Sequence, residues 1–321
     1  MPRSFFRNTR DLALLRSHAL SLQYLRVFAY IDAVARAGSI RKAAEALFIT
    51  PSALDRRVQD LERELGTPLF ERHARGMRLT AAGELFLHHV RAQRADFERI
   101  HGEIEHLKGL RRGTVSIAAS QALAYSVLPE LINRMRAANP GIGFKVRICD
   151  RQAVVTALRD FDADLGLVYN VQPASDLAPL MQVEQRLCAV MAEQHPLAAQ
   201  EKVKMRDCLA YPLAMPDATL GGRALLDGFF ARSSLSPKVV LESNSFEMLR
   251  NFVRSNDAVS FQIQVGTPLS RNQDGVTARM IEDRAFPRQP LTVAQLKGRH
   301  LPQPALRFLA ALREVLNGND A

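Results

Sequence analysis

The first part of the chain carries an apolar pattern typical of short helices separated by tight turns. Over residues 21–37, apolar side chains recur at three- and four-residue intervals, at Leu22, Leu25, Phe28, Ala29 and Ala33. Gly38 ends this pattern, and the Ser39 hydroxyl can cap a second helix from Ile40 to Leu47. The spacing therefore predicts two helices joined by a very short turn.

A third helix opens with a strong start signal, a threonine N-cap followed by proline at the first helical position. Thr50 and Pro51 supply these groups, and Gly66 suits the left-handed conformation that ends a helix. One face is apolar: Leu54, Val58, Leu61 and Leu65. The opposite face is polar and basic: Ser52, Arg56, Gln59 and Arg63. This arrangement favours a DNA-binding helix-turn-helix; an ordinary three-helix bundle with a solvated charged face is the alternative.

After the third helix, the sequence predicts a basic hairpin and then a long helix. Arg72, Arg75 and Arg78 surround a predicted turn, a pattern suited to contacting phosphates or a minor groove. Thr80 can cap a helix that runs to about Lys108 and carries a mainly apolar heptad frame. Its positions are Phe86, Val90, Gln93, Phe97, Ile100, Ile104 and Leu107. They predict pairing with a second copy of the chain, and packing on the helix's own domain is the alternative.

Beyond Gly113 the pattern changes to strands that alternate with helices. Short apolar runs predict strands over Thr114–Ser120, Phe144–Cys149 and Asp164–Tyr169. Helical spacing between them predicts helices over Leu123–Ala138 and Gln152–Asp160. The later elements are a strand over Arg186–Met191, a second α/β stretch over about 192–284, a strand over Leu291–Ala294 and a helix over Pro304–Leu316. Such alternation is typical of βαβ units and a parallel sheet.

Composition adds a polyanionic partner to this picture. The 321 residues include 43 Lys+Arg and 33 Asp+Glu, a net charge of +10 at pH 7. Most of the basic residues are arginine, which suits contacts with phosphate. Residues 1–112 hold 20 basic and 13 acidic residues, so about two-thirds of the excess lies in the first third of the chain. The asymmetry predicts an N-terminal part that faces nucleic acid.

The sequence argues against export and against a disulfide framework. Cys149, Cys188 and Cys208 form no C-x-x-C pair and fit a reducing compartment. No apolar run reaches the ~18 residues that a membrane-spanning helix needs. The only apolar run near the N-terminus is cut off by Arg16, so residues 1–20 are interpreted as a solvated tail or the product of an upstream start codon. A transit peptide is the alternative, and we expect a cytoplasmic protein.

Catalytic and metal chemistry find little support in the sequence. The histidines of the long helix lack the i, i+4 spacing of a zinc site and are interpreted as solvated: His88, His89, His101 and His106. No nucleophile elbow, P-loop or dinucleotide fingerprint occurs. Cys149 and Cys188 lie on predicted strands, where inert buried thiols are expected. We therefore expect no enzyme, no metal and no cofactor.

Seven short segments within the first 83 residues match a known pattern in order. They are Leu22…Phe28, Gly38-Ser39-Ile40, Ala43-Ala44-Glu45-Ala46-Leu47, Ser52-Ala53-Leu54, Leu61-Glu62-Arg63-Glu64-Leu65-Gly66, Pro68-Leu69-Phe70-Glu71-Arg72 and Leu79-Thr80-Ala81-Ala82-Gly83. This part resembles the N-terminus of LysR-type transcriptional regulators. The layout of residues 113–321, with the signatures Gly113-Thr114-Val115 and His195-Pro196-Leu197, is similar to their effector domain, which looks like a type 2 periplasmic binding protein.

The resemblance implies an α+β chain built from consecutive parts. These are a tail over 1–20, a winged helix-turn-helix over 21–80 with the helix-turn-helix at about 39–58, a dimerising linker helix over 81–112, and an α/β effector module over 113–321. The module would comprise a first subdomain over 113–190 plus 285–321 and a second over 191–284, with a small-molecule effector in the cleft.

The implied function is sequence-specific transcriptional regulation under the control of a small-molecule effector. The partners would be an inverted repeat in double-stranded promoter DNA, a second copy bound through the linker helix, a homotetramer, and RNA polymerase. A solute-binding protein of the type 2 periplasmic class is the alternative, because it would share the second half of the chain.

The start of the third helix departs from the family pattern at two positions. A glutamine that could read adenine is replaced by Pro51, and a serine by Asp55, which repels phosphates but can accept a hydrogen bond from cytosine N4. We expect an altered DNA preference, with Ser52 and Arg56 at base edges and the remaining arginines on the backbone. The complete expected set is Ser39, Thr50, Ser52, Asp55, Arg56, Arg57, Arg72, Arg75 and Arg78.

An effector site is expected where strands end and helices begin. In open α/β sheets, ligands lie beyond the carboxyl ends of the strands, where helix N-termini offer unpaired N–H groups. The residues expected there, by their position and by the family resemblance, are Ser120, Gln121, Thr219, Gly221, Asn244 and Phe261. An anionic molecule such as a carboxylate is the expected effector.

Overall fold

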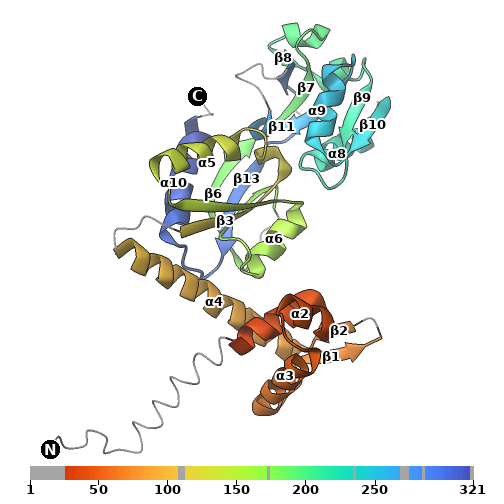
Figure 1. The fold of residues 1–321 in the computed structure, drawn as a ribbon. Helices are drawn as coiled ribbons and strands as arrows, with labels where there is room; N and C mark the ends of the chain where they lie inside the picture. Colours follow the sequence, from red (N-terminus) through yellow and green to blue (C-terminus); the bar gives the residue numbers. More distant parts are fainter. Residues whose placement is uncertain are drawn as a thin grey trace, which may run out of the picture. The chain divides into compact units, whose positions relative to one another are not determined.

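The structure, a computed structural model, describes residues 26–74, 76–107, 113–171, 174–233, 236–267, 275–283 and 286–318. These residues form two compact units, one reaching to Phe97 and one beginning at Glu98 (Figure 1). The expected tail over 1–20, the start of the first predicted helix with Leu22 and Leu25, Arg75 and the end of the expected linker over 108–112 lie outside the described residues.

The first unit consists of helices and a two-stranded hairpin. A helix over 26–37 is followed by α2 (Ile40–Ala46), α3 (Pro51–Leu65) and the antiparallel strands β1 (Phe70–His73) and β2 (Gly76–Leu79). The core of this unit contains Ile31, Val34, Ala43, Ala44, Leu54, Val58, Leu61, Leu69, Phe70 and Leu87. The predicted apolar stripe of α3 is confirmed at Leu54, Val58 and Leu61, whereas Leu65 at its end is 42% exposed.

The long helix α4 (Ala81–Leu107) changes its surroundings along its length. Leu87 and Val90 are buried, so the first turns of α4 pack on their own unit. Farther along, Phe97, Ile100 and Ile104 are 57%, 41% and 46% exposed. The heptad frame therefore serves an internal core in its first part and presents an apolar stripe in its later part.

The second unit contains a five-stranded sheet with the strand order β4-β3-β5-β13-β6. Its strands are β3 (Gly113–Ala119), β4 (Ile142–Ile148), β5 (Leu165–Tyr169), β6 (Leu177–Gln185) and β13 (Gln289–Leu296). The strand β3 is parallel to both neighbours, whereas β13 is antiparallel to β5 and β6. The helices are α5 (Val127–Ala138), α6 (Arg151–Arg159) and α10 (Gln303–Gly318). Every residue of β5 is buried because helices cover both faces of the sheet (Figure 1).

A six-stranded sheet with the order β10-β9-β11-β7-β12-β8 forms the second subdomain. Its strands are β7 (Leu187–Ala192), β8 (Lys202–Val203), β9 (Leu213–Pro216), β10 (Val239–Ser243), β11 (Val259–Ile263) and β12 (Val276–Ile281). The helices α7 (Met205–Cys208), α8 (Arg223–Arg232) and α9 (Phe246–Arg254) accompany it. The strand β9 is parallel to β10 and β11, as the βαβ pattern predicts.

The chain passes between the two sheets twice. The first passage is at Arg186, because β7 pairs with β11 and β12 in the second sheet. The boundary expected at residue 190 is thus displaced: the strand assigned to the end of the first subdomain belongs mostly to the second. The return passage lies between the end of β12 at Ile281 and the start of β13 at Gln289, and the expected boundary at 285 lies outside the described residues.

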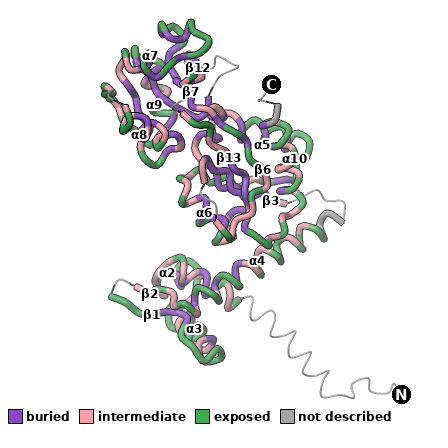
Figure 2. The backbone as a smooth tube through the Cα atoms, turned by 180° about the vertical axis from the view of Figure 1, so that it is seen from behind, coloured by how far each residue is buried: buried purple, intermediate pink, exposed green. Residues whose placement is uncertain are grey.

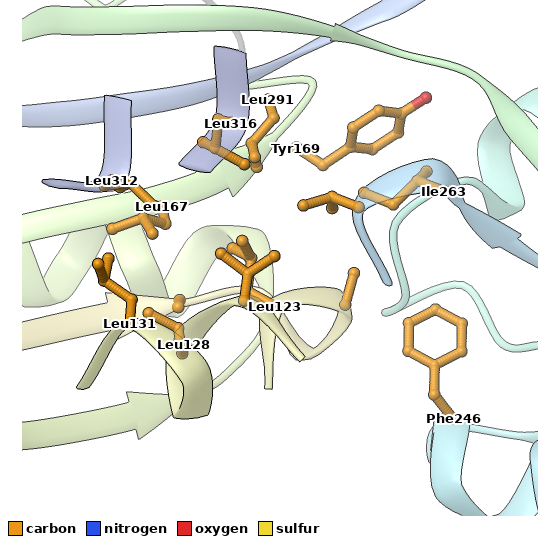
Figure 3. Packing of buried hydrophobic residues seen from close by; sticks show 14 of the residues in the cluster. Leu123, Leu128, Leu131, Leu167, Tyr169, Phe246, Ile263, Leu291, Leu312 and Leu316 are labelled. Carbon is orange, nitrogen blue, oxygen red and sulfur yellow. The ribbon is translucent and has the colours of Figure 1, made fainter. Parts of the chain in front are cut away.

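One apolar cluster extends through both subdomains. Leu123 and Tyr169 belong to the first subdomain, while Phe246 and Ile263 belong to the second, and all four share this cluster (Figure 3). Buried positions follow inner strands such as β7 and β13, whereas the outer faces of the helices are exposed (Figure 2). The two subdomains therefore contact each other through apolar side chains, and a cleft can form beside this contact.

Candidate DNA interface and effector site

The start of α3 is built as the local sequence predicts. The Thr50 hydroxyl accepts a hydrogen bond from the Ala53 N–H at 3.3 Å, and Pro51 occupies the first turn. Gly66 ends the helix with φ of 69°, in the left-handed region that glycine tolerates. The outward face is exposed at all four expected positions, Ser52, Arg56, Gln59 and Arg63. The geometry therefore presents a polar, basic helix face to solvent.

The expected DNA-contacting residues differ in what holds them. Arg56 and Arg57 are exposed, and within the described ranges neither forms an ion pair. Ser39 is the N-cap of α2, where its hydroxyl accepts from the Lys42 N–H at 3.5 Å. Arg78 is exposed on β2, directly across from Glu71 of β1. Ser39 thus has a capping role, whereas Arg56, Arg57 and Arg78 are exposed and can contact a partner.

The hairpin is held against α2 and α3 by several contacts. The Glu62 carboxylate of α3 accepts hydrogen bonds from the Leu69 and Phe70 N–H groups at 2.7 and 3.1 Å. The Met77 N–H donates to the Gly38 carbonyl at 2.8 Å. A Cβ at Gly76 would overlap that same carbonyl oxygen, so glycine is needed for this close approach. The wing is therefore fixed relative to α3.

Asp55 does not project freely toward a partner. Its Oδ1 accepts from Arg72 Nη2 at 2.7 Å, and its Oδ2 accepts from Gln59 Nε2 at 2.9 Å. From the sequence, Asp55 is only a possible acceptor for cytosine N4 among the expected DNA-contacting residues, and Arg72 is expected to contact the DNA backbone. The structure joins them into one ion pair between α3 and β1.

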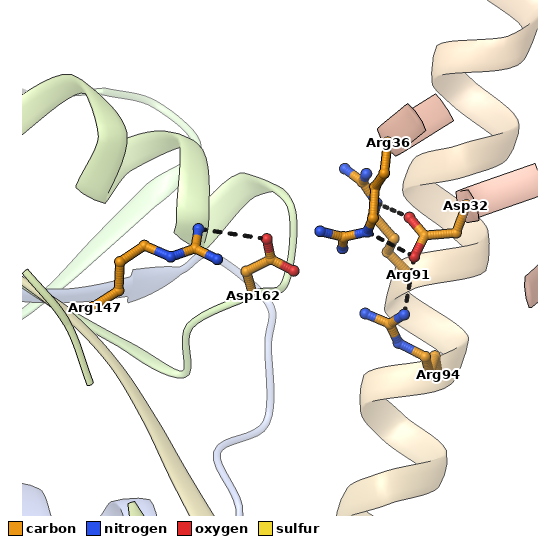
Figure 4. A network of polar contacts seen from close by, with 6 residues as sticks. All are labelled: Asp32, Arg36, Arg91, Arg94, Arg147 and Asp162. Carbon is orange, nitrogen blue, oxygen red and sulfur yellow. Dashed lines mark hydrogen bonds and ion pairs between the residues drawn. The ribbon is translucent and has the colours of Figure 1, made fainter. Parts of the chain in front are cut away.

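A buried carboxylate that sequence reasoning missed connects the first helix to α4. Asp32 is 5% exposed and accepts from Arg36 at 2.9 Å, Arg91 at 2.8 Å and Arg94 at 3.0 Å (Figure 4). Burial alone would raise the pKa of Asp32, but the hydrogen bonds from Arg91 and Arg36 outweigh it, so its pKa lies below the ordinary value. The ionised Asp32 therefore holds the helix over 26–37 against the middle of α4.

A cavity of about 280 Å³ opens between the two subdomains and brings together five of the six residues expected in the effector site. These five are Ser120, Gln121, Thr219, Gly221 and Asn244. They come from the carboxyl end of β3, the start of α8 and the end of β10, which are strand–helix junctions. The strand-end rule therefore located a real concavity.

Gln121 spans this cleft. Its Oε1 accepts from the Phe246 N–H at 2.6 Å, and its Nε2 donates to the Asn244 carbonyl at 3.3 Å. Both partners lie in the second subdomain, at the N-terminus of α9, whereas Gln121 lies in the first. A single side chain thereby connects the two walls of the cleft.

Six further residues line the cavity and were not among the expected ones: Ile148, Cys149, Asp150, Arg151, Tyr169 and Leu220. Asp150 caps α6, since its Oδ1 accepts from the Ala153 N–H at 2.8 Å. Arg151 has no ion-pair partner in the described part of the chain. The signal for these residues was present, because the predicted strand over Phe144–Cys149 also ends at this edge of the sheet.

Two titratable side chains of the cleft stay neutral. Tyr169 is 2% exposed, its hydroxyl has no hydrogen-bond partner among the residues described, and burial raises its pKa. Burial and then the neighbouring Asp150 raise the pKa of the Cys149 thiol. The cleft therefore contains a thiol, not a thiolate, and an unsatisfied buried hydroxyl.

The prediction that Phe261 faces the effector is wrong. Phe261 is fully buried in β11, within the apolar core of the second subdomain. The next residue, Gln262, lines a separate cavity of about 460 Å³ on the other side of Gln121. Successive residues of a strand point to opposite faces, so an assignment one residue off places a core side chain in the site.

The described residues contain no group of three or more histidine, cysteine or acidic side chains placed to hold a metal ion. Nor, over the same ranges, is any helix long and apolar enough to cross a membrane.

Comparison with known proteins matches both units of the chain. Residues 25–84 match the bacterial regulatory helix-turn-helix proteins of the lysR family, and residues 108–317 match the LysR substrate binding domain. The HTH-type transcriptional activator CmpR of Synechocystis sp. is 29% identical over 236 residues, covering 74% of this chain and 77% of its own. A probable RuBisCO transcriptional regulator of Trichormus variabilis is 26% identical over 273 residues, covering 81% and 80%.

Solved structures show the same fold over nearly the whole chain. HinK, a LysR family transcriptional regulator from Pseudomonas aeruginosa, is 27% identical with a TM-score of 0.53, covering 91% of this chain and 98% of its own. Full-length OxyR from the same organism has a TM-score of 0.64 at 20% identity, covering 91% and 94%. CbnR complexed with its target DNA has a TM-score of 0.59 at 20% identity, covering 90% and 99%.

Proposed function

The chain belongs to the LysR family of transcriptional regulators, and from this premise we propose how it acts. A homodimer binds an inverted repeat in promoter DNA through α3 and the wing, and a small organic anion in the cleft controls it. The regulator works in the cytoplasm, where the DNA is, and catalyses no reaction.

The DNA contact is supported by the exposed face of α3. Ser52 and Arg56 lie on the side of the helix opposite its buried stripe, and Arg57 lies beside them. The N-terminal residues of a recognition helix are those that contact base edges in the major groove. We assign Ser52 and Arg56 to bases, and Arg57, Arg75 and Arg78 to the phosphate backbone.

The effector proposal is carried by one observation, the 280 Å³ cavity with Arg151 in its wall. Gly222 begins α8 without a side-chain cap, so no side chain occupies that helix N-terminus. A helix N-terminus and a guanidinium both favour an anion. Together these groups suit a carboxylate, with Ser120, Gln121, Thr219, Gly221 and Asn244 as the surrounding polar contacts.

The dimer is supported by the apolar stripe at Phe97, Ile100 and Ile104 of α4, because large exposed apolar side chains at helical spacing favour pairing with another helix. Membership of the family further suggests a homotetramer and contact with RNA polymerase. We divide the chain accordingly into a DNA-binding domain over 21–80, a linker helix over 81–112 and an effector domain from 113 onward, with the subdomain change at Arg186. A solute-binding protein is not favoured, because the match over 25–84 is to a DNA-binding domain.

The DNA-binding part is tested with the full chain. Wild-type protein selects its operator from random-sequence DNA, and affinities for operator and unrelated DNA are then compared. Arg56→Ala should lower the ratio of the two affinities, whereas the adjacent Arg57→Ala should weaken both alike. Equal losses on both sequences for Arg56→Ala would refute its base-reading role.

The effector part is tested by calorimetric and thermal-shift titration of small carboxylates and, as controls, their neutral amides. A carboxylate that stabilises the wild type should bind about tenfold more weakly to Arg151→Gln, because a charged hydrogen bond is lost. Arg147→Gln is the matched control, since Arg147 is exposed near the end of β4, the strand that precedes α6, but lines no part of this cavity. Binding of the amides in preference to the acids would contradict an anionic effector.

A further inference from the structure

Asp55 and Arg72 form an ion pair between the recognition helix and the wing. We propose that this pair is a specificity element for DNA: Asp55 positions the Arg72 guanidinium to contact a guanine edge, and Asp55 itself contacts no base. The inference rests on the proposed DNA binding, and it moves Arg72 from the phosphate backbone to the bases.

The Asp55 carboxylate is engaged within the protein. Each Asp55 oxygen already accepts one hydrogen bond, from Arg72 at 2.7 Å and from Gln59 at 2.9 Å. A carboxylate is an acceptor only, so in the major groove it can contact only the amino groups of cytosine and adenine. With both oxygens engaged and its charge balanced by Arg72, Asp55 acts within the protein. The repulsion that a bare aspartate would exert on phosphates is offset by the same contact.

The strand β1 places Arg72 beside α3. Alternate residues of a strand share a face, so Arg72 lies on the same side of β1 as the buried Phe70, which faces the helices. Glu71 and His73 lie on the other side and contact each other at 3.3 Å. Because Glu62 of α3 holds the start of β1 through two backbone N–H groups, the base of the Arg72 side chain is fixed relative to α3.

The ion pair orients Arg72 more than it stabilises the fold. The side chains of Arg72 and Asp55 are 67% and 30% exposed. Exposed ion pairs contribute little to folding, because water already solvates both groups and salt screens them. This ion pair therefore contributes little to the free energy of unfolding. Its effect is to restrict where a long, flexible arginine can point, which reduces the entropy lost when that arginine binds.

Arg72 keeps hydrogen-bond donors that the contact with Asp55 does not use. A guanidinium has five N–H donors, and Asp55 engages one Nη2 donor. Arg72 lies beside the fifth residue of α3, in the half of the helix that contacts base edges in this class of domain. A planar guanidinium with a free edge matches the paired acceptors O6 and N7 of guanine. Neither Arg56 nor Arg57 is held by a carboxylate in the described part of the chain.

The test compares four full-length proteins on the operator that the wild type selects from random DNA. Arg72→Ala should lose about 10- to 100-fold in affinity for the operator and clearly less for unrelated DNA. Asp55→Asn keeps the shape but removes the charge that holds Arg72, so the ratio of operator to unrelated affinity should fall about three- to tenfold. The double variant should match Arg72→Ala within about twofold, because Asp55 acts only through Arg72.

A DNA substitution identifies the contact. Replacing each operator guanine in turn by 7-deazaguanine, which lacks the N7 acceptor, should reveal one symmetric position that weakens the wild type but not Arg72→Ala. Arg78→Ala is the matched control: it should lose affinity on both DNAs alike and reduce the slope of log K against log salt by about one. Thermal melting of all variants distinguishes a folding defect from a binding effect.

Two results would overturn the proposal. One is an equal loss on both DNAs for Arg72→Ala with a salt slope reduced as in Arg78→Ala, which identifies Arg72 as a phosphate contact. The other is a further loss when Asp55→Asn is added to Arg72→Ala, which shows that Asp55 reads a base directly. A wild-type chain that selects no sequence at all would instead contradict the proposed function.

Discussion

The side-chain oxygen of Gln121 lies 2.6 Å from the backbone nitrogen of Phe246, and this hydrogen bond joins the two subdomains across the effector cleft. The amide nitrogen of the same side chain reaches the Asn244 carbonyl at 3.3 Å. The Phe246 N–H and the Asn244 carbonyl lie at the N-terminus of α9, so widening of the cleft must stretch or break these two hydrogen bonds. Gln121 therefore links the width of the cleft to the relative position of the two subdomains.

Replacing Gln121 by Leu should weaken this coupling. The change leaves the partly buried Phe246 N–H without its partner, which costs about 1–3 kcal/mol in the free energy of unfolding. Effector affinity should fall as well, because the walls of the cleft are no longer held together before binding. Urea unfolding measures the change in stability, and titration with a carboxylate that binds the wild type measures the change in affinity. An unchanged affinity would show that Gln121 only supports the fold.

Replacing Asp32 by Asn should destabilise the first unit by about 3–5 kcal/mol at pH 7, because three arginines lose their buried carboxylate partner. The pKa of Asp32 is lowered on folding, so its contribution is fully present above the ordinary value of 3.8 and is lost as the pH falls through the folded value. The difference between wild type and variant should therefore shrink below pH 3.8.

Urea unfolding of wild type and Asp32→Asn at pH 7 and at pH 3 measures whether the difference in stability shrinks at low pH. Asp60→Asn is the control, because the Asp60–Arg63 pair is exposed on α3 and should contribute at most about 0.5 kcal/mol. A difference between wild type and Asp32→Asn that grows as the pH falls would show that the carboxylate is not stabilised by the arginines.

The apolar stripe of α4 should be needed for dimerisation. Phe97→Asp combined with Ile104→Asp places charges among exposed apolar side chains and should raise the dissociation constant of the dimer at least tenfold. Ala95→Asp is the control, since helical periodicity puts it on the opposite side of α4. Sedimentation velocity across a concentration series measures the change. Dimers of equal strength in both proteins would place the interface elsewhere.

Core and cleft residues should respond differently to substitution. Phe261→Ala removes a fully buried ring and should cost about 3–5 kcal/mol in the free energy of unfolding. Gly221→Val should instead block the cleft, because a Cβ there already lies 3.1 Å from the Tyr169 ring. Thermal melting and effector titration of both variants separate the two roles. Stronger effector binding by Gly221→Val would contradict this position for the site.

Local sequence determined the parts of this protein that depend on neighbours in the chain. Thr50, Pro51 and Gly66 set the start and end of α3 because caps and backbone angles act within a few residues. The strand-end rule likewise located Ser120, Gln121, Thr219, Gly221 and Asn244 at one cavity, because parallel strands bring their carboxyl ends to the same edge. The edge strand β6 is absent from the sequence-based prediction, because its apolar and polar residues alternate only weakly and it includes Pro179.

Only the tertiary structure decided which distant groups meet. Asp32 and Arg91 are 59 residues apart, and Asp55 and Arg72 are 17 apart, and no local pattern pairs them. The same holds for Phe261, whose strand is buried along its whole length, so that polarity did not mark which side faces the cleft. Short-range sterics and hydrogen bonding select helices, strands and turns, but side-chain partners are fixed when those elements pack, because packing sets the distances on which electrostatics and burial depend.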